Sequence, residues 1–189
     1  MNANQPFSLC VYCGSKPGHR PAHAELARVV GHWLGAQGGQ LVYGGGQGGL
    51  MGVVAQATAE AGGRVVGIIP QALVDKELAR HECDELHIVT TMHERKQAMA
   101  DRAQAFLALP GGIGTFEEFF EAWTWRQLGY HNKPIGLLNH AGFYDGLTAF
   151  CQHSLQEGFM GDWQMDLITV GTEPLPLLSA LLSQAQSNG

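Results

Sequence analysis

Charged residues are scarce in this chain of 189 residues: they make up 15% of it, while hydrophobic residues make up 45%. The 11 Lys and Arg residues form no cluster and the net charge is −6, which argues against a nucleic-acid partner. No apolar run reaches the roughly 20 residues that a membrane-spanning helix needs, and the short polar start is not typical of a signal peptide. We therefore expect a cytoplasmic protein without membrane contact, much of which is buried or covered by a partner subunit.

Cysteines and clusters of metal ligands are also sparse. Of the four cysteines, Cys10 and Cys13 form a Cys-x-x-Cys pair, a spacing found in redox and metal sites. Both lie in or just after the first expected strand and no second pair completes a zinc site, so small buried residues explain them better. Residues 81–87 include His, Glu, Cys and Asp, but their spacing matches no standard ligand set and indicates a solvated loop. The sequence therefore predicts neither a metal nor a redox cofactor.

Strand and helix patterns alternate along the whole chain. Apolar runs typical of buried strands occur at 7–12, 40–43, 64–69, 86–89, 105–109, 134–138 and 168–170. Helical patterns occur at 22–36, 53–61, 92–101, 115–128, 143–157 and 174–184. This alternation predicts an α/β fold, a Rossmann-like doubly wound parallel sheet with helices on both faces. We expect a single domain over residues 1–189, with an ordered core from about 7 to 184 and a polar, irregular excursion at 72–85.

Three glycine-rich loops follow expected strands, at 13–18, 44–52 and 110–114. In a parallel sheet the carboxyl ends of the strands lie at one edge, and ligands bind beyond that edge. The three loops are therefore expected to converge on one crevice. Their glycines let backbone N–H groups approach an anion closely.

The loop at 110–114 is the most informative of the three. Pro110-Gly111-Gly112 stops an apolar run, and an acidic amphipathic helix follows, which is the outline of a phosphate-accepting loop at a helix N-terminus. Thr115 could cap that helix or hydrogen-bond a phosphate oxygen, and Glu118 lies one turn further on. A carboxylate beside an anion site suggests chemistry. The alternative is a capping box, because the spacing from Thr115 to Glu118 also fits one.

The loop at 44–52 formally matches a dinucleotide fingerprint through Gly44, Gly46 and Gly49. The fingerprint also needs an acidic residue at the end of the next strand, and that strand ends at Pro70 without one. A Walker loop is excluded because no Gly-Lys-Ser/Thr follows the glycines. We therefore expect a site for a mononucleotide-like phosphate. Close packing of the strand on the next helix is the alternative.

Arg95 and Lys96 lie in the first turn of the helix expected at 92–101, which also starts at the carboxyl end of a strand. Arg95 offers a planar fork for a phosphate or a leaving group, and Lys96 offers a point charge. Both could therefore face the crevice. Glu94 and Asp101 are near in sequence, so a solvated helix face explains the two residues equally well.

Several motifs then follow one another in order: Cys13-Gly14-Ser15, Gly44-Gly45-Gly46-x-Gly-Gly-Leu-Met-Gly, Met92-x-x-Arg95-Lys96, Pro110-Gly-Gly-x-Gly-Thr-x-x-Glu118, Thr124-Trp125-x-Gln127-Leu128-Gly129 and Lys133-Pro134-Ile135-Gly136-Leu137-Leu138. Together they resemble the LOG ("lonely guy") family of cytokinin-activating phosphoribohydrolases, over roughly residues 7–182. Some members of that family were once labelled lysine decarboxylases. The resemblance implies a homodimer that hydrolyses the N-glycosidic bond of a nucleoside 5′-monophosphate. AMP and N6-isopentenyladenosine 5′-monophosphate are then the expected substrates, and free base and ribose 5-phosphate the products.

The resemblance also implies site residues. Arg95 and Glu118 correspond to the catalytic pair of the family. The positions expected to contact the substrate are Ser15, Gly44, Gly45, Gly46, Glu77, Arg95, Lys96, Gly112, Ile113, Gly114, Thr115, Phe116, Glu117, Glu118, Glu121 and Thr124. Lys16 departs from the pattern, because many relatives have a second serine there, and it could alter the phosphate pocket.

The chemistry agrees with these roles. Cleavage of an N-glycosidic bond builds positive charge on the ribose ring, which a carboxylate stabilises while it orients or deprotonates water. We expect Glu118 to do this, with Glu121 as a second contributor and Arg95 stabilising the departing base or holding the nucleotide. The glycine loops, Ser15 and Thr115 are expected to bind the 5′-phosphate, with no cofactor.

Two other functions compete with this one. A non-catalytic carrier of a nucleotide or a phosphorylated cofactor needs the same glycine loops, but it has no need of Arg95 together with Glu118. A decarboxylase needs pyridoxal phosphate on a lysine, and no lysine of the chain lies in a recognisable context for that cofactor. The aromatic helix at 115–128, with Phe119, Phe120, Trp123 and Trp125, is expected to lie partly in the core and partly at the dimer interface.

Overall fold

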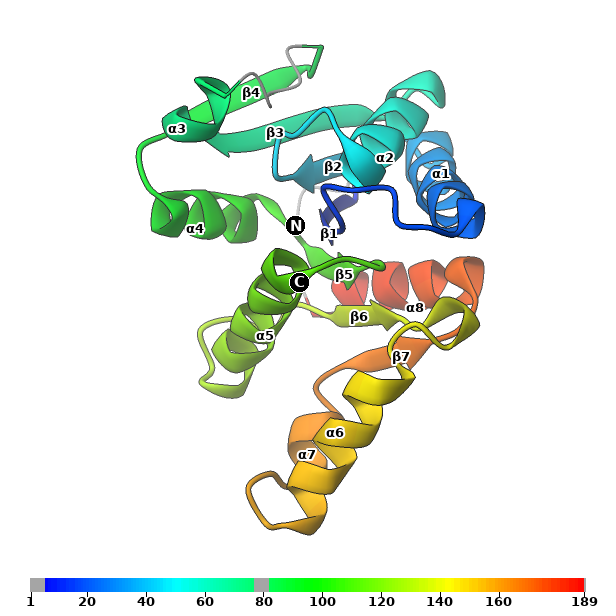
Figure 1. The fold of residues 1–189 in the computed structure, drawn as a ribbon, viewed down its shortest axis with the longest axis vertical. Helices are drawn as coiled ribbons and strands as arrows, with labels where there is room; N and C mark the ends of the chain where they lie inside the picture. The colour runs from blue at the N-terminus through cyan, green and yellow to red at the C-terminus, as the bar shows by residue number, and fades with distance from the viewer. Residues whose placement is uncertain (1–5, 77–81, 189) are drawn as a thin grey trace.

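A computed structural model describes residues 6–76 and 82–188 and has one seven-stranded sheet at its centre (Figure 1). All of its strand pairs are parallel. The order across the sheet is β4 (Glu85–Val89), β3 (Arg64–Pro70), β2 (Gln40–Tyr43), β1 (Ser8–Tyr12), β5 (Ala105–Ala108), β6 (Ile135–Leu138) and β7 (Thr169–Gly171). The chain thus winds outward from β1 first in one direction and then in the other, which confirms the expected doubly wound sheet.

Helices cover both faces of the sheet. On one face α1 (Pro21–Ala36), α2 (Gly49–Glu60) and α8 (Pro174–Ser187) enclose a core of aliphatic residues such as Leu34, Val54 and Leu178. On the other face α4 (Met92–Arg102), α5 (Ile113–Gln127) and α6 (Asp145–Gln156) enclose a core that is richer in aromatic residues, among them Phe106, Phe119 and Trp123. The two layers lie on opposite sides of the strands (Figure 1).

β1 shows how the sequence builds this double core. Every residue of Ser8–Tyr12 is buried, and alternate side chains point to opposite faces of a strand. Cys10 therefore packs in the aromatic core, whereas Cys13, just beyond the strand, packs in the aliphatic one. All four cysteines are free thiols. Cys10 and Cys13 are thus small buried residues on opposite faces of the sheet, and the redox-pair alternative is wrong.

Two helices begin earlier than the sequence predicted, and in both the N-cap residue is a glycine. α2 begins at Gly49 and α5 at Ile113, four and two residues earlier than expected, with Gly48 and Gly112 as extended N-cap residues. A glycine gives no side-chain signal, so the pattern placed both starts too late. A short α3 (Gln71–Val74) lies in the segment expected to be irregular, and α8 continues to Ser187 instead of ending near 184.

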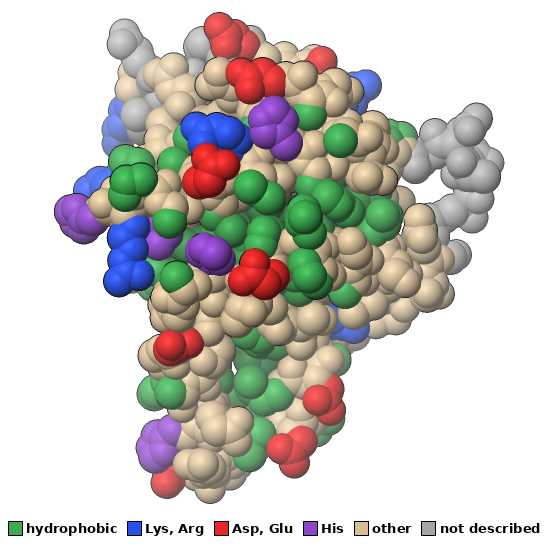
Figure 2. All heavy atoms as spheres, turned by 90° about the vertical axis from the view of Figure 1, so that its right-hand side faces the viewer, with side chains coloured by type: hydrophobic (Ala, Val, Ile, Leu, Met, Phe, Trp, Pro, Cys, Tyr) green, Lys and Arg blue, Asp and Glu red, His purple; other side chains and the backbone are tan. Residues whose placement is uncertain are grey.

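Beyond the sheet, α6 and the short α7 (Asp162–Met165) extend away from the other helices as an arm (Figure 1). Hydrophobic side chains gather across the middle of the face seen in Figure 2, with scattered charged ones around them. On the arm, Phe150, Phe159 and Trp163 are exposed. Within the described part of the chain, every helix is too short or too polar to cross a bilayer.

Candidate active site

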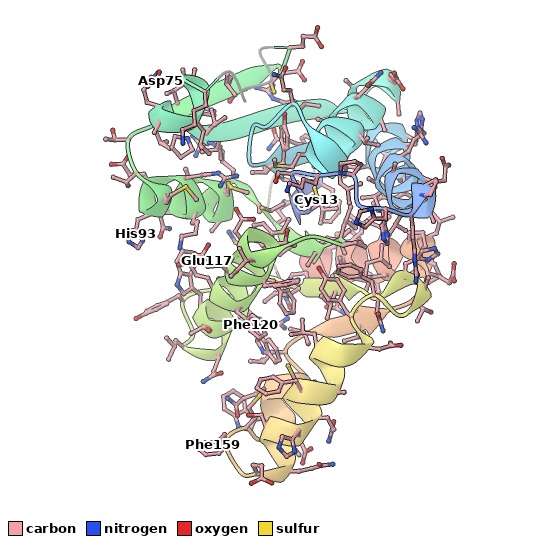
Figure 3. The ribbon with its side chains drawn as sticks, in the orientation of Figure 1. Cys13, Asp75, His93, Glu117, Phe120 and Phe159 are labelled. Carbon is pink, nitrogen blue, oxygen red and sulfur yellow. The ribbon has the colours of Figure 1, made fainter. Side chains whose placement is uncertain are left out.

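The three glycine loops meet at the carboxyl edge of the sheet, as the sequence predicted. The N–H of Gly14 donates to the Pro110 carbonyl oxygen at 3.1 Å, and the N–H of Leu50 donates to the Gly14 carbonyl oxygen at 2.9 Å. Gly14 follows Cys13, which is labelled in Figure 3, and its two bonds tie the loop after β5 to the first turn of α2. These backbone bonds fix the floor of one crevice from segments far apart in the sequence.

A capping box at the start of α4 places the two cations. The Thr91 hydroxyl accepts from the Glu94 N–H at 3.1 Å, and the Glu94 carboxylate accepts from the Thr91 N–H at 3.2 Å. Arg95 and Lys96 follow directly and point inward from the first turn of the helix. This capping box was not predicted, although the Thr91-x-x-Glu94 spacing in the sequence signals it.

Arg95 is buried, with 8% of its surface exposed, and two backbone carbonyl oxygens and a carboxylate lie around its guanidinium. It donates to the carbonyl oxygens of Ile68 at 3.1 Å and Gly44 at 3.3 Å, and its Nη1 lies 3.5 Å from the Glu118 carboxylate. A Cβ atom at Gly44 would lie 1.8 Å from the guanidinium, so the first glycine of this loop makes room for Arg95. The surface-charge alternative for Arg95 is therefore wrong.

Glu118 is the second buried member of this pair, with 9% exposure. Burial raises the pKa of Glu118 to about 7, and the opposing attraction of Arg95 does not cancel this effect. Because α5 begins at Ile113, Glu118 lies in its second turn and caps nothing, so the capping-box alternative is wrong. A carboxyl group that titrates near neutrality can exchange protons under physiological conditions.

Lys96 is also buried and bridges two other carboxylates of α5. Its Nζ lies 2.5 Å from Glu117 and 3.0 Å from Glu121, and Glu117 lies on the side of α5 that faces α4 (Figure 3). Burial alone lowers the pKa of Lys96, but the hydrogen bonds to Glu117 and Glu121 outweigh it and raise that pKa. Lys96 therefore stays charged and joins α4 to α5 beside the Arg95–Glu118 pair.

The N-terminus of α5 is open. Its N-cap residue, Gly112, offers no side-chain cap, and a Cβ at Gly112 or Gly114 would meet nothing within 4 Å. The first helical bond runs from the Phe116 N–H to the Gly112 carbonyl oxygen, so the helix offers no partner to the N–H groups of residues 113–115. The Thr115 side chain packs against Gly111. Free N–H groups at the positive end of a helix dipole are suited to an anion.

The remaining expected residues lie in different surroundings. Gly45 and Gly46 are buried with Gly44, whereas Ser15 is exposed in the loop after β1. Thr124 is exposed and follows Glu117 and Glu121 at helical spacing, so the three share one face of α5. Glu77 lies outside the described residues.

A groove of about 660 Å³ is lined by the end of β4, by α4 and by two residues of α5. Glu121 and Trp125 line it from α5, and His93 lines it from α4, whose outer end it occupies (Figure 3). Within residues 6–76 and 82–188, no three His, Cys, Asp or Glu side chains gather as metal ligands would. The polar groups of the crevice are the cations of α4, the carboxylates of α5 and the backbone N–H groups at the start of α5.

The chain is similar in sequence to members of one protein family, and in fold to several solved structures. Residues 51–181 match the family described as possible lysine decarboxylase. The chain is 44% identical over 176 residues to the cytokinin riboside 5′-monophosphate phosphoribohydrolase LOG2 of Arabidopsis thaliana, covering 93% of this chain and 82% of the relative. It is 46% identical over 156 residues to the enzyme of the same name from Rhodococcoides fascians, covering 82% and 79%.

Solved structures resemble the fold at lower identity. The molybdenum cofactor binding protein of Rippkaea orientalis has a TM-score of 0.71 at 18% identity, covering 96% of this chain and 98% of that one. The Moco carrier protein of Chlamydomonas reinhardtii has a TM-score of 0.70 at 20% identity, covering 97% and 99%. These two likenesses concern the fold alone. The sequence relationships show more: the chain belongs to the LOG family, the one matched as possible lysine decarboxylase.

Proposed function

We propose that this chain hydrolyses the N-glycosidic bond of adenosine 5′-monophosphates, with or without an N6 substituent, and releases the free base and ribose 5-phosphate. The names of its relatives in Arabidopsis thaliana and Rhodococcoides fascians support this activity. The observation that carries the proposal is the buried Arg95–Glu118 pair beside the open N-terminus of α5. An anion site next to a carboxylate of raised pKa suits a phosphorylated substrate whose reaction needs a base.

In this proposal the 5′-phosphate binds to the free N–H groups of residues 113–115, with Ser15 and Thr115 as hydroxyl donors. Gly112 and Gly114 leave the space that a phosphate needs. The three buried glycines at 44–46 contribute indirectly, because Gly44 holds Arg95 rather than opening toward solvent. The phosphate then fixes the ribose with C1′ near Glu118.

Glu118 has the central chemical role. In its ionised form it stabilises the positive charge that develops on the ribose ring and accepts a proton from the attacking water. Arg95, 3.5 Å away, orients that carboxylate and stabilises negative charge on the departing base. Glu121 lines the groove and pairs with Lys96 at 3.0 Å, and in this proposal it is the second carboxylate that contributes to the reaction.

We place the base and its N6 substituent in the groove that α4, Glu121 and Trp125 line. Lys96, Glu117 and Thr124 contact the nucleotide from α4 and α5 in this proposal, and Glu77 is a further contact, as the family resemblance implies. Ile88 and Trp125 give the groove an apolar part, in keeping with a prenylated adenine as well as a plain one. The ratio of rates with the two kinds of base measures this preference.

The experiment incubates the purified protein with AMP and, separately, with N6-isopentenyladenosine 5′-monophosphate, and follows the free base by chromatography. The matching ribosides without phosphate are the controls. Release of base from the monophosphates alone supports the proposal. Binding of the nucleotides without any release favours the carrier function instead.

The decarboxylase description of the family is not supported by the lysines. Lys96 is paired with two carboxylates, and the Lys133 ammonium donates to the Ala100 carbonyl oxygen at 2.6 Å, at the end of α4. Lys16 and Lys76 are exposed. None of the four offers an unpaired amine in an enclosed pocket, which a Schiff base with pyridoxal phosphate needs. Incubation with lysine and pyridoxal phosphate is expected to release no carbon dioxide.

We also propose that the protein is a cytoplasmic homodimer. The four free thiols suit a reducing compartment. The exposed aromatic side chains of the arm, Phe150, Phe159 and Trp163, form an apolar surface that a second copy would cover. Light scattering coupled to size-exclusion chromatography measures the mass, and Phe159→Ser is expected to lower it toward that of one chain if the arm forms the interface.

A further inference from the structure

Leu109 directly follows β5, and its carbonyl oxygen accepts a hydrogen bond from the side chain of Tyr144, 35 residues later in the chain. Tyr144 donates its hydroxyl to the Leu109 carbonyl oxygen at 2.6 Å, and the N–H of Leu109 donates to the Tyr12 carbonyl oxygen at 2.9 Å. Tyr144 is 2% exposed, and burial raises its pKa, so the hydroxyl remains protonated and able to donate. Leu109 directly precedes Pro110 and the glycines of the open loop.

The turn that carries Tyr144 is strained. Among the described residues, Ala141 is the one non-glycine residue with a positive φ, at 51°. This left-handed conformation is unfavourable for a residue with a Cβ atom, and it persists only where the surroundings determine it.

The side-chain amide of Asn139 holds this turn in its strained conformation. Its Oδ1 accepts from the Tyr144 N–H at 2.6 Å, and its Nδ2 donates to the Asp145 carboxylate at 2.7 Å. At Gly142 a Cβ would lie 2.6 Å from the same carboxylate. The end of β6, the turn and the start of α6 are thus locked together around Tyr144.

The ring of Tyr144 also contacts the first turn of α5. The rings of Phe116 and Tyr144 meet edge to face, with their centroids 6.2 Å apart. Phe116 makes the first hydrogen bond of that helix, to Gly112. Tyr144 therefore contacts the chain on both sides of the loop: Leu109 before it, through the hydroxyl, and Phe116 after it, through the ring.

We propose that Tyr144 is a positioning residue for nucleotide binding, which fixes the open loop between Leu109 and Phe116. The inference rests on the proposed function, in which the free N–H groups of this loop receive the 5′-phosphate. Donors that are already in place bind a ligand without the cost of ordering them, so a loosened loop lowers affinity. Glu118 is in the second turn of α5, and its chemistry on the bound nucleotide stays the same.

Tyr144→Phe tests this role, because it removes the hydroxyl and keeps the ring against Phe116. The matched control is Ser8→Ala, which removes a buried hydroxyl that donates to the Arg102 carbonyl oxygen at 2.6 Å, at the amino end of β1. KM and kcat are measured for base release from AMP, and the Kd of ribose 5-phosphate by calorimetry. Tyr144→Phe is expected to raise KM and Kd by about 10-fold and to change kcat by less than about 2-fold. Ser8→Ala is expected to leave all three within about 2-fold, although both variants lower the Tm.

Unchanged KM and Kd in Tyr144→Phe would overturn the positioning role, and so would an equal loss of affinity in Ser8→Ala. Phe116→Leu is a second variant that keeps the hydroxyl bond and removes the ring contact, and it is expected to raise the same two constants less. Failure of the proposed function has a different signature. If the unaltered protein binds ribose 5-phosphate but releases no base, the activity is refuted, and the Kd values of the variants still decide the role of Tyr144.

Discussion

Two neighbouring cations on α4 meet two neighbouring carboxylates on α5, and the two pairs differ in almost every respect. Lys96 and Glu117 approach to 2.5 Å, and half of the Glu117 side chain, 51%, is exposed. Arg95 and Glu118 stand 3.5 Å apart, with only 10% and 11% of their side chains exposed. A short, partly solvated pair satisfies its charges, whereas a looser buried pair leaves a carboxylate whose charge is costly to keep.

Helix geometry explains why adjacent residues do such different work. Successive side chains of an α-helix point about 100° apart, so Glu117 faces α4 at the rim while Glu118 points into the crevice. The Lys96 bridge continues to Glu121 at 3.0 Å and holds the two helices together. We infer that the Lys96 bridge holds α4 and α5 in place at the rim where they contact the nucleotide, and that the Arg95–Glu118 pair carries the reaction.

The largest expected effect separates the two carboxylates directly. Glu118→Gln is expected to lower kcat for base release by at least about 100-fold with a modest change in KM, because the amide can neither stabilise the ribose cation nor accept a proton. Glu117→Gln, one residue away, is expected to change kcat by no more than about 5-fold, because Glu121 still pairs with Lys96. Near-normal turnover in Glu118→Gln would remove Glu118 from the mechanism.

The second-largest effect is expected from a substitution at Gly44, which disturbs the Arg95–Glu118 pair without replacing either residue. Gly44→Ala places a Cβ 1.8 Å from the present position of the Arg95 guanidinium, which must move away from Glu118. The backbone at Gly44 does not have a positive φ, so alanine fits the loop and only the flexible end of Arg95 is displaced. We expect kcat to fall by about 10–100-fold, with a lower Tm because the displaced guanidinium loses its hydrogen bonds.

Gly146→Ala on α6 is the matched control, because its Cβ would meet nothing within 4 Å. Steady-state kinetics and thermal unfolding are measured on both variants. Normal turnover in Gly44→Ala would mean that the reaction does not depend on where Arg95 lies.

The sequence predicted the parallel sheet and the convergence of the glycine loops, because both follow from the alternation of strands and helices along the chain. The motifs also pointed to Arg95 and Glu118, two residues that the fold brings together. Other features depend on contacts between distant segments, which no local pattern encodes. Gly44 has the look of a phosphate-binding glycine, yet it accommodates Arg95 from 51 residues away.

The role of Tyr144 depends in the same way on a bond across 35 residues. The starts of α2 and α5 were missed because glycine N-caps carry no side-chain signal. Thr91 and Glu94 form a capping box, whereas Thr115 and Glu118 have the same spacing and form none. Two identical local signals can thus have different outcomes, and the residue at which the helix begins decides between them.

A smaller effect concerns the cost of keeping Glu118 buried. Its folded-state pKa of about 7 lies above the ordinary value of 4.5, so the ionised form destabilises the fold. The penalty is absent below pH 4.5, grows between pH 4.5 and 7, and is complete above pH 7. Glu118→Gln is therefore expected to raise the free energy of unfolding at pH 8 by roughly 1–3 kcal/mol, and to have little effect at pH 4. Denaturant unfolding at the two pH values checks this, and a variant less stable at pH 8 would contradict it.

The smallest effect links the two pairs through the pH dependence of the reaction. Glu118 must be ionised to act, so kcat/KM is expected to rise with pH to a plateau, with an inflection near the pKa of about 7. Burial sets most of that value; Arg95 and Lys96 lower it, whereas the charges of Glu117 and Glu121 raise it. Glu117→Gln removes one of the charges that raise the pKa of Glu118. It should move the inflection down by about a few tenths of a pH unit, with a relative gain in activity near pH 6.

The measurement is a pH–rate profile from pH 5 to 9 for both proteins. A flat profile would show that ionisation of Glu118 does not limit the reaction, and an upward shift in the variant would show that the Lys96 bridge acts on Glu118 by moving Lys96 rather than through charge.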